Sequence, residues 1–177
     1  SASPYAGYNT SEGATFNSAG NNNTNLNING LFSLMNITFD TANVAAYTIG
    51  TGAANSQRIV IGNNGNFKIT STAANSQTFN CAVMLGGGST SGSYTLQNDN
   101  TNRLLTFNNI YVTNVLTTAG TKTLAFAGSG NITVLGNITK NTASGITLND
   151  SNSGTVSFAG TNVIATLNVH AGTLLLT

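Results

Sequence analysis

The chain has very little charge. Its 177 residues include five Lys or Arg and four Asp or Glu, a charged share of 5%, where an average soluble domain has about a quarter. Its net charge is only +1, and 40% of its residues are hydrophobic, which is the opposite of the pattern of disordered proteins. Because little electrostatic repulsion keeps its copies apart, we expect a folded chain that tends to associate.

The scarcity of charge also excludes several partners. Nucleic-acid binding requires grouped Lys and Arg, and the cations of this chain are scattered singly: Arg58, Lys68, Arg103, Lys122 and Lys140. No apolar stretch approaches the ~20 residues of a membrane span, and the apolar run Thr173–Thr177 has only the length of a strand. We therefore expect neither a nucleic-acid partner nor a membrane span.

Methionine is missing from the start of the chain, and cysteine is almost missing altogether. Ser1–Gly7 has no Met, basic stretch or apolar core, which is typical of an exported chain whose signal has been removed, or of a piece of a longer protein. Cys81 is the single cysteine, and its apolar setting predicts a buried, unreactive thiol. We expect one domain over residues 1–177, located outside the cell or on its surface.

What the chain does contain predicts an all-β fold. Helix formers are too few to sustain a polar helical face, while Thr, Val, Ile and Asn dominate. Short runs with alternating polarity recur, separated by turn pairs such as Asn64-Gly65, Ser129-Gly130 and Ser153-Gly154. The predicted strands are Tyr47–Ile49, Arg58–Ile61, Asn66–Thr70, Tyr94–Gln97, Lys122–Phe126, Asn131–Val134 and Thr155–Phe158.

Internal repeats predict how these strands are arranged. Ala53–Gln57 recurs unchanged as Ala73–Gln77, and Leu105-Thr-Phe107 resembles Leu124-Ala-Phe126, at offsets of 20 and 19 residues. A third match, between Thr123–Gly128 and Thr155–Gly160, has an offset of 32. We therefore predict a parallel β-solenoid with rungs of about 20 residues, in which the 29 asparagines stack at the bends. An antiparallel sandwich is the alternative.

The C-terminal third resembles a known repeat. The matching residues are Lys140, Ile146–Leu148, Ser153–Gly160, Asn162 and Asn168–Leu176. They are similar to the autotransporter-associated β-strand repeat of exported bacterial surface proteins, although Val163–Thr166 replaces the usual Tyr-x-Gly-Gly-Thr turn. The resemblance implies a single-stranded right-handed parallel β-helix, export across a bacterial envelope, and a scaffold without catalytic residues.

No group of residues predicts catalysis, a metal or a cofactor. The acids Glu12, Asp40, Asp99 and Asp150 are far apart in sequence. With 20-residue rungs, Asp40 and Asp99 are about three rungs apart, or ~14 Å, which is too far for the paired carboxylates of a glycosidase. We expect isolated turn carboxylates. His170 has no partner nearby in sequence, and Gly86–Gly88 lacks the helix and Lys of a phosphate loop. We therefore predict no catalytic, cofactor-binding or metal-binding residues.

Two functions are open on these grounds. The first is a structural protein whose terminal rungs pair with other copies to build a filament or matrix, because Gly172–Thr177 is an apolar strand with nothing predicted to cover it. The second is an adhesin-type module that displays a Thr/Asn-rich face to glycans or to another surface. A carbohydrate-active enzyme ranks last, for lack of paired acids.

Overall fold

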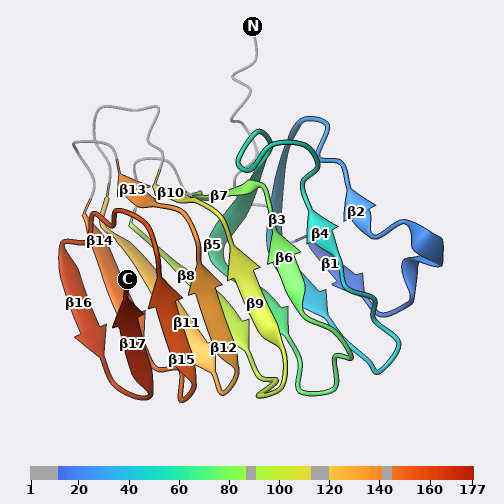
Figure 1. Ribbon diagram of the computed structural model, residues 1–177. Helices are drawn as coiled ribbons and strands as arrows, with labels where there is room; N and C mark the ends of the chain where they lie inside the picture. Colours follow the sequence, from blue (N-terminus) through green and yellow to red (C-terminus); the bar gives the residue numbers. More distant parts are fainter. Residues whose placement is uncertain (1–11, 87–90, 113–119, 141–144) are drawn as a thin grey trace, which may run out of the picture.

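The strands of this protein coil into a parallel β-solenoid of about five turns (Figure 1). A computed structural model describes residues 12–86, 91–112, 120–140 and 145–177. One sheet has ten strands: β1 (Gly13–Phe16), β3 (Leu31–Phe39), β5 (Arg58–Ile69), β7 (Ala82–Leu85), β8 (Gly92–Asn98), β10 (Ile110–Val112), β11 (Lys122–Gly128), β13 (Ile138–Lys140), β14 (Ile146–Asp150) and β16 (Thr166–Val169). The other, sheet B, has seven: β2 (Asn25–Leu26), β4 (Thr48–Ile49), β6 (Gln77–Phe79), β9 (Leu104–Phe107), β12 (Asn131–Val134), β15 (Thr155–Phe158) and β17 (Thr173–Leu176). The one helical element in the described ranges is a 3-10 turn, η1 (Gly20–Asn22).

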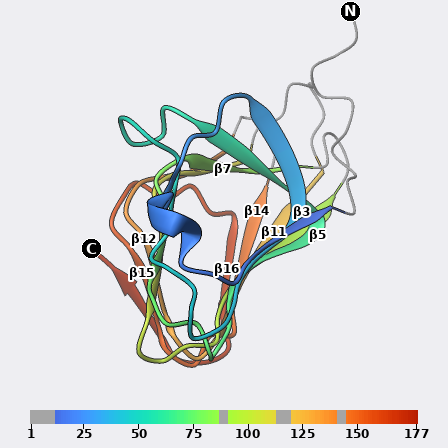
Figure 2. The ribbon, with the colours of Figure 1, turned by 90° about the vertical axis from the view of Figure 1, so that its right-hand side faces the viewer.

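The ten-stranded sheet divides into two branches because β3 and β5 bend. The first half of β5, Arg58–Ile61, pairs with β7, whereas its second half, Asn66–Ile69, pairs with β8. At the bend Asn64 has a φ of 63°, a left-handed conformation that Asn tolerates better than most residues. The long branch comprises β1, β3, β5, β8, β11, β14 and β16, and the short branch adds β7, β10 and β13. Viewed along the axis, the two branches and sheet B are the three sides of the coil (Figure 2).

The rungs are longer than the sequence predicts. They average about 27 residues rather than 20, and they vary in length. Ile49 pairs with Phe79 and Phe79 with Phe107 in the middle of sheet B, whereas at the C-terminal end Phe158 pairs with Leu176 across a much shorter rung. The prediction of a parallel solenoid is confirmed, and the predicted rung length is wrong.

The internal repeats gave the wrong rung length because each match relates two different sides of the coil. Ala53–Gln57 leads from sheet B into β5, and Ala73–Gln77 leads from β5 back into sheet B. Both glutamines use the side-chain oxygen in the same way: Ile28 N donates to Gln57 Oε1 at 3.0 Å, and Tyr47 N donates to Gln77 Oε1 at 2.9 Å. The repeated sequence is therefore a corner that binds the rung below, and its offset measures the distance between two corners. The other two matches likewise relate a strand of sheet B to β11.

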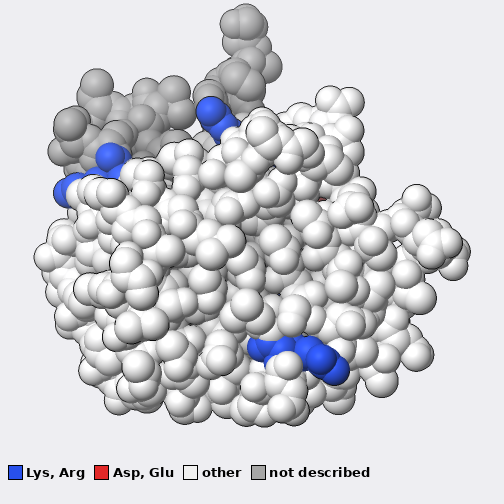
Figure 3. Space-filling view, viewed as in Figure 1, with Lys and Arg blue, Asp and Glu red and all other residues white. Residues whose placement is uncertain are grey.

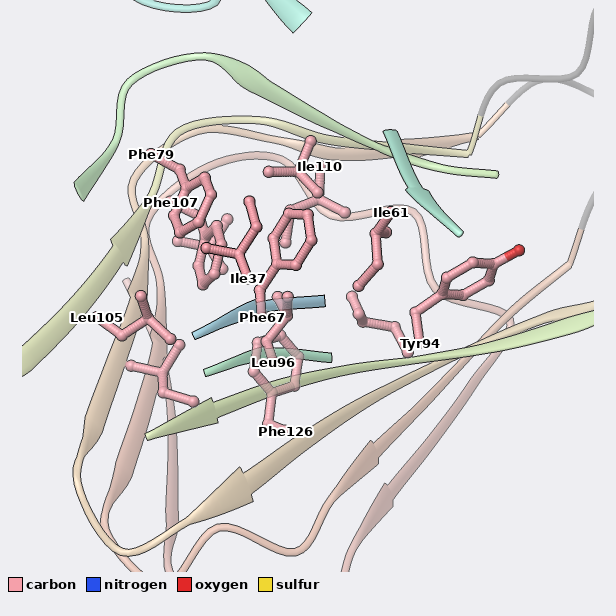
Figure 4. Close-up of a cluster of buried hydrophobic side chains, with 14 of the residues drawn as sticks. Ile37, Ile61, Phe67, Phe79, Tyr94, Leu96, Leu105, Phe107, Ile110 and Phe126 are labelled. Carbon is pink, nitrogen blue, oxygen red and sulfur yellow. The ribbon is translucent and has the colours of Figure 1, made fainter. Parts of the chain in front are cut away.

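Aromatic side chains stack along the interior. Alternate residues of each strand point inward and are buried, such as Phe67, Leu96 and Phe126 in the long branch (Figure 4). The ring centroids of Phe67 and Phe79 are 5.2 Å apart, and those of Phe79 and Phe107 are 4.9 Å apart. Burial of such side chains contributes about 1.5–3 kcal/mol each, so this continuous core stabilises the coil.

Asparagine side chains connect the rungs at the corner between the long branch and sheet B. Asn98 Nδ2 donates to the carbonyls of Arg103 and Asn131 at 2.8 and 2.7 Å. Asn152 Nδ2 donates to two carbonyls of the preceding rung, both at 2.9 Å. Both asparagines are fully buried, and these bonds satisfy backbone groups that a bend removes from the strand ladder. The sequence predicts asparagines that stack on one another at the bends, whereas these bonds run from the asparagine side chains to backbone carbonyls.

Candidate interaction surfaces

The C-terminal rung leaves its core residues uncovered. β16 pairs only with β14, and β17 only with β15, so within the described ranges each has one edge without a partner strand. Leu167, Val169 and Leu176 continue the interior columns of the coil and are 43%, 48% and 63% exposed. The last described rung therefore exposes apolar side chains that elsewhere in the coil are buried.

The first described rung also has strand edges without a partner among the described residues, which begin at residue 12. There β1 pairs only with β3, β2 pairs only with β4, and Leu31–Leu34 of β3 pairs only with β5. Leu31 and Phe32 are 41% and 51% exposed. Every strand pair in both sheets is parallel, so the free edges at the two ends have matching strand direction.

One titratable group lies directly beneath the C-terminal rung. Asp150 is fully buried in the interior column that contains Phe126 below it and Val169 above it. Its Oδ1 accepts the Asn152 N–H at 3.0 Å, while Oδ2 has no hydrogen-bond partner in the described part of the chain. Burial raises the pKa of Asp150, and the Asn152 N–H opposes that shift. The prediction of a turn carboxylate is confirmed for Oδ1, but the sequence did not predict the burial.

Asp40 and Asp99 lie closer together than predicted. Phe39, Ile69 and Asn98 are stacked in consecutive rungs, so the two acids that flank this column are two rungs apart, about 10 Å at the ~4.8 Å spacing of strands. Lys68, on the rung between them, is 2.7 Å from Asp99 through Nζ and Oδ2.

Asp40 is held in its ionised form. Its Oδ1 accepts hydrogen bonds from the Thr70 and Thr72 hydroxyls and from the Thr41 N–H, at 2.7–2.8 Å. These bonds, the one from Thr70 first, lower the pKa of Asp40. A glycosidase general acid has a raised pKa, which is the opposite of the direction at Asp40.

Three further residues have nucleophilic or titratable side chains. Cys81 is buried, and desolvation raises its pKa to about 12, as predicted for an unreactive thiol. His170 is exposed in the corner between β16 and β17. Lys122 is fully buried in β11, where burial lowers its pKa, and its burial was not predicted. The described residues contain no group of three or more His, Cys, Asp or Glu side chains placed to hold a metal. Of the Gly86–Gly88 triplet, only Gly86 lies within the described residues.

A shallow polar hollow lies at the outer edge of the long branch. Its volume is about 270 Å³, and only hydroxyl, amide and glycine residues line it: Asn63, Asn64, Ser91, Gly92, Ser93, Thr121 and Thr123. Asn63 Oδ1 is part of its structure, because it accepts the Ser93 N–H of the next rung at 3.0 Å. The hollow therefore offers neutral donors and acceptors and no charge.

The chain was compared with known proteins at three levels. No protein-family model, no curated protein and no solved structure matches it. The described residues also include no helix with the length and hydrophobicity that crossing a lipid bilayer requires. The structure shows the fold, a parallel β-solenoid.

Proposed function

We propose that this chain is a structural protein that assembles end to end, with the last rung of one copy pairing with the first rung of the next. The observation that carries the proposal is that both terminal rungs of the described chain have strand edges without a partner strand, with exposed interior-column residues such as Val169 and Leu176 at the last rung. An unpaired strand edge is a template for another chain. Head-to-tail contacts that do not close into a ring generate filaments.

The energetics favour such a contact. Burying Leu167, Val169 and Leu176 under a second copy would contribute about 1.5–3 kcal/mol for each side chain that becomes fully buried. New hydrogen bonds along both sheets would add to this. With a net charge of +1, two copies repel each other little on approach.

The location proposed for the filament is the cell exterior or cell surface. The support is the resemblance of Asn168–Leu176 and the preceding segments to repeats of exported bacterial surface proteins. In this proposal the coil is a scaffold, and it acts on no substrate.

A double variant of the last rung tests end-to-end assembly. Val169→Lys with Leu176→Lys places two charges on the interior columns of the open end, where they would have to be buried in the contact. Thr166→Lys is the matched control, because Thr166 lies on the outer face of the same rung. Sedimentation velocity at rising concentrations should show growing species for the wild type and the control, and monomers for the double variant. A wild type that stays monomeric at high concentration would contradict the proposal.

The polar hollow favours a second candidate, an adhesin-type module that holds neutral sugars. Its hydroxyl and amide lining, including Thr121 and Thr123, suits hydrogen bonding to glycans. Glycan-array binding that is lost in Thr121→Lys would support this candidate, and an array without signal would remove it.

A further inference from the structure

The strands of sheet B contain no charged residue. None of the seven, all of them described, contains Lys, Arg, Asp or Glu, although the exposed Arg103 directly precedes β9. Figure 3 views this side of the molecule, where Lys and Arg atoms lie along the upper margin and in one group towards the lower edge, and the surface between them is uncharged. The long branch differs, since Lys68 and Asp99 form an ion pair on its outer side. The uncharged face is therefore a property of one side of the coil.

A column of hydroxyl groups runs along the middle of this face. The residues are stacked in register, one in each rung: Thr48, Thr78, Thr106, Thr133 and Ser157. All five are partly exposed, and strand spacing places them ~4.8 Å apart. The Thr133 and Ser157 hydroxyls are 2.9 Å apart and bond to each other. A hydroxyl that already has a partner within the column costs less to remove from water.

Three exposed leucines lie around the column. Leu104, Leu135 and Leu175 point outward from sheet B and are 36%, 53% and 47% exposed. The aromatic residues of the neighbouring strands, such as Phe107 and Phe158, are all buried in the core. Sugar polymers are commonly held by exposed aromatic rings, and this face has none in its strands. A face of uncharged hydroxyls and leucines is better suited to contact with another protein surface of the same composition.

We propose that the outer face of sheet B packs against the same face of a second copy, joining filaments side by side. The face spans about six rungs of ~4.8 Å and four residues of ~3.3 Å, roughly 400 Å² per copy, which is half of the ~800 Å² per partner in a stable complex. One pair of copies would therefore hold weakly. Two filaments repeat the contact along their whole length, which makes the pairing strong. This inference rests on the proposed end-to-end assembly.

The hydroxyl columns give the contact its specificity. On both copies, the outward side chains of sheet B form ridges that repeat at the strand spacing. The ridges of one face therefore fit between the ridges of the other at each rung, as in the dry interfaces between paired sheets of identical chains. Such an interface uses the same surface on both copies. A charge in the column would be buried opposite its own copy and would oppose pairing.

Electron microscopy of the full chain tests the pairing. Thr78→Lys with Thr106→Lys charges two neighbouring rungs of the column, and Thr95→Lys with Ala125→Lys is the matched control on two neighbouring rungs of the long branch. We expect paired or bundled filaments for the wild type and the control. The Thr78/Thr106 variant should give single filaments of unchanged length, with at least a tenfold loss of bundles at equal concentration.

The outcomes separate the two proposals. Wild-type filaments that remain single, or bundles that persist in the Thr78/Thr106 variant, would overturn side-by-side pairing and leave end-to-end assembly intact. Short wild-type rods that pair side by side, together with unpaired rods of the Thr78/Thr106 variant, would support pairing and contradict end-to-end assembly. Single short rods would contradict both. Binding of a soluble glycan that is lost in the Thr78/Thr106 variant, with no pairing, would assign the face to a sugar partner instead.

Discussion

Single polar side chains determine how one rung holds the next. Where a strand bends, its backbone groups lose their neighbours in the ladder, and buried amides such as Gln77, Asn98 and Asn152 replace them. Backbone geometry contributes as well: Gly128 has a φ of 98°, and a Cβ there would lie 2.0 Å from the Asn98 carbonyl oxygen. The high asparagine content of the chain is thus a requirement of its corners.

Asp150 makes stability depend on pH. Burial raises its pKa in the folded state above the ordinary 3.8, so the unfolded state releases the proton more readily and stability falls as the pH rises from about 4 through the folded pKa. Asp150→Asn removes this loss and keeps an acceptor for the Asn152 N–H. We expect the variant to be more stable than the wild type at pH 7 and to show no gain at pH 3.

Thermal unfolding at pH 3, 5 and 7 checks this prediction. Asp99→Asn is the control, because its exposed ion pair with Lys68 contributes about 0–1 kcal/mol. A variant that is no more stable than the wild type at pH 7, or one whose gain in stability is the same at pH 3 and pH 7, would contradict the account.

The sequence predicts the strands of this protein better than it predicts the corners. Most strands follow from alternating polarity: Asn131–Val134 and Thr155–Phe158 are β12 and β15 as predicted, and Arg58–Ile61 and Asn66–Ile69 are the two halves of β5. Side-chain alternation along a strand is local, so local sequence is enough to predict it.

The corner amides predict a large difference between two glutamines. Gln77→Ala leaves the buried Tyr47 N–H and the Ala45 carbonyl without the partners they have at 2.9 Å, which should cost about 2–4 kcal/mol. Gln97 has its side-chain bonds to Asn66 and Asp99 on the outer face, so Gln97→Ala should cost less than about 1 kcal/mol. Urea unfolding of both variants measures this, and equal losses would show that the corner amide has no special role.

Rung length could not be read from the sequence, because it depends on the corners. Two corners of one rung share Ala-Ala-Asn-Ser-Gln since both glutamines satisfy a backbone N–H of the rung below. Matching them gives an offset of 20 residues, whereas Gln77 lies 30 residues from Tyr47, the residue beneath it. The repeat therefore reflects hydrogen bonding that two corners of one rung share, and its offset is not the length of a rung.

That error also hid the candidate surfaces. With 20-residue rungs, Thr78, Thr106 and Thr133 do not stack, and the hydroxyl column of sheet B is invisible. The burial of Asp150 was hidden for the same reason, because its inward position depends on pairing with Phe126. The apolar last strand needed no register to be predicted.

The described rungs combine a continuous core with exposed apolar side chains at Leu31–Leu34 and at β16 and β17, and with strands in sheet B that contain no charged residue. The net charge of +1 removes a common barrier to association. These features belong together if the molecule is a unit of a filament: the ends add copies along the axis, and sheet B joins filaments sideways.

X-ray diffraction from oriented wild-type filaments tests end-to-end assembly most directly. If each copy continues the sheets of the one before, the strands lie across the filament and a sharp reflection at ~4.8 Å falls along its axis. The Val169→Lys with Leu176→Lys variant should give no filaments to orient. Filaments whose ~4.8 Å reflection lies across the axis, or a wild type that forms only separate rods, would contradict the account.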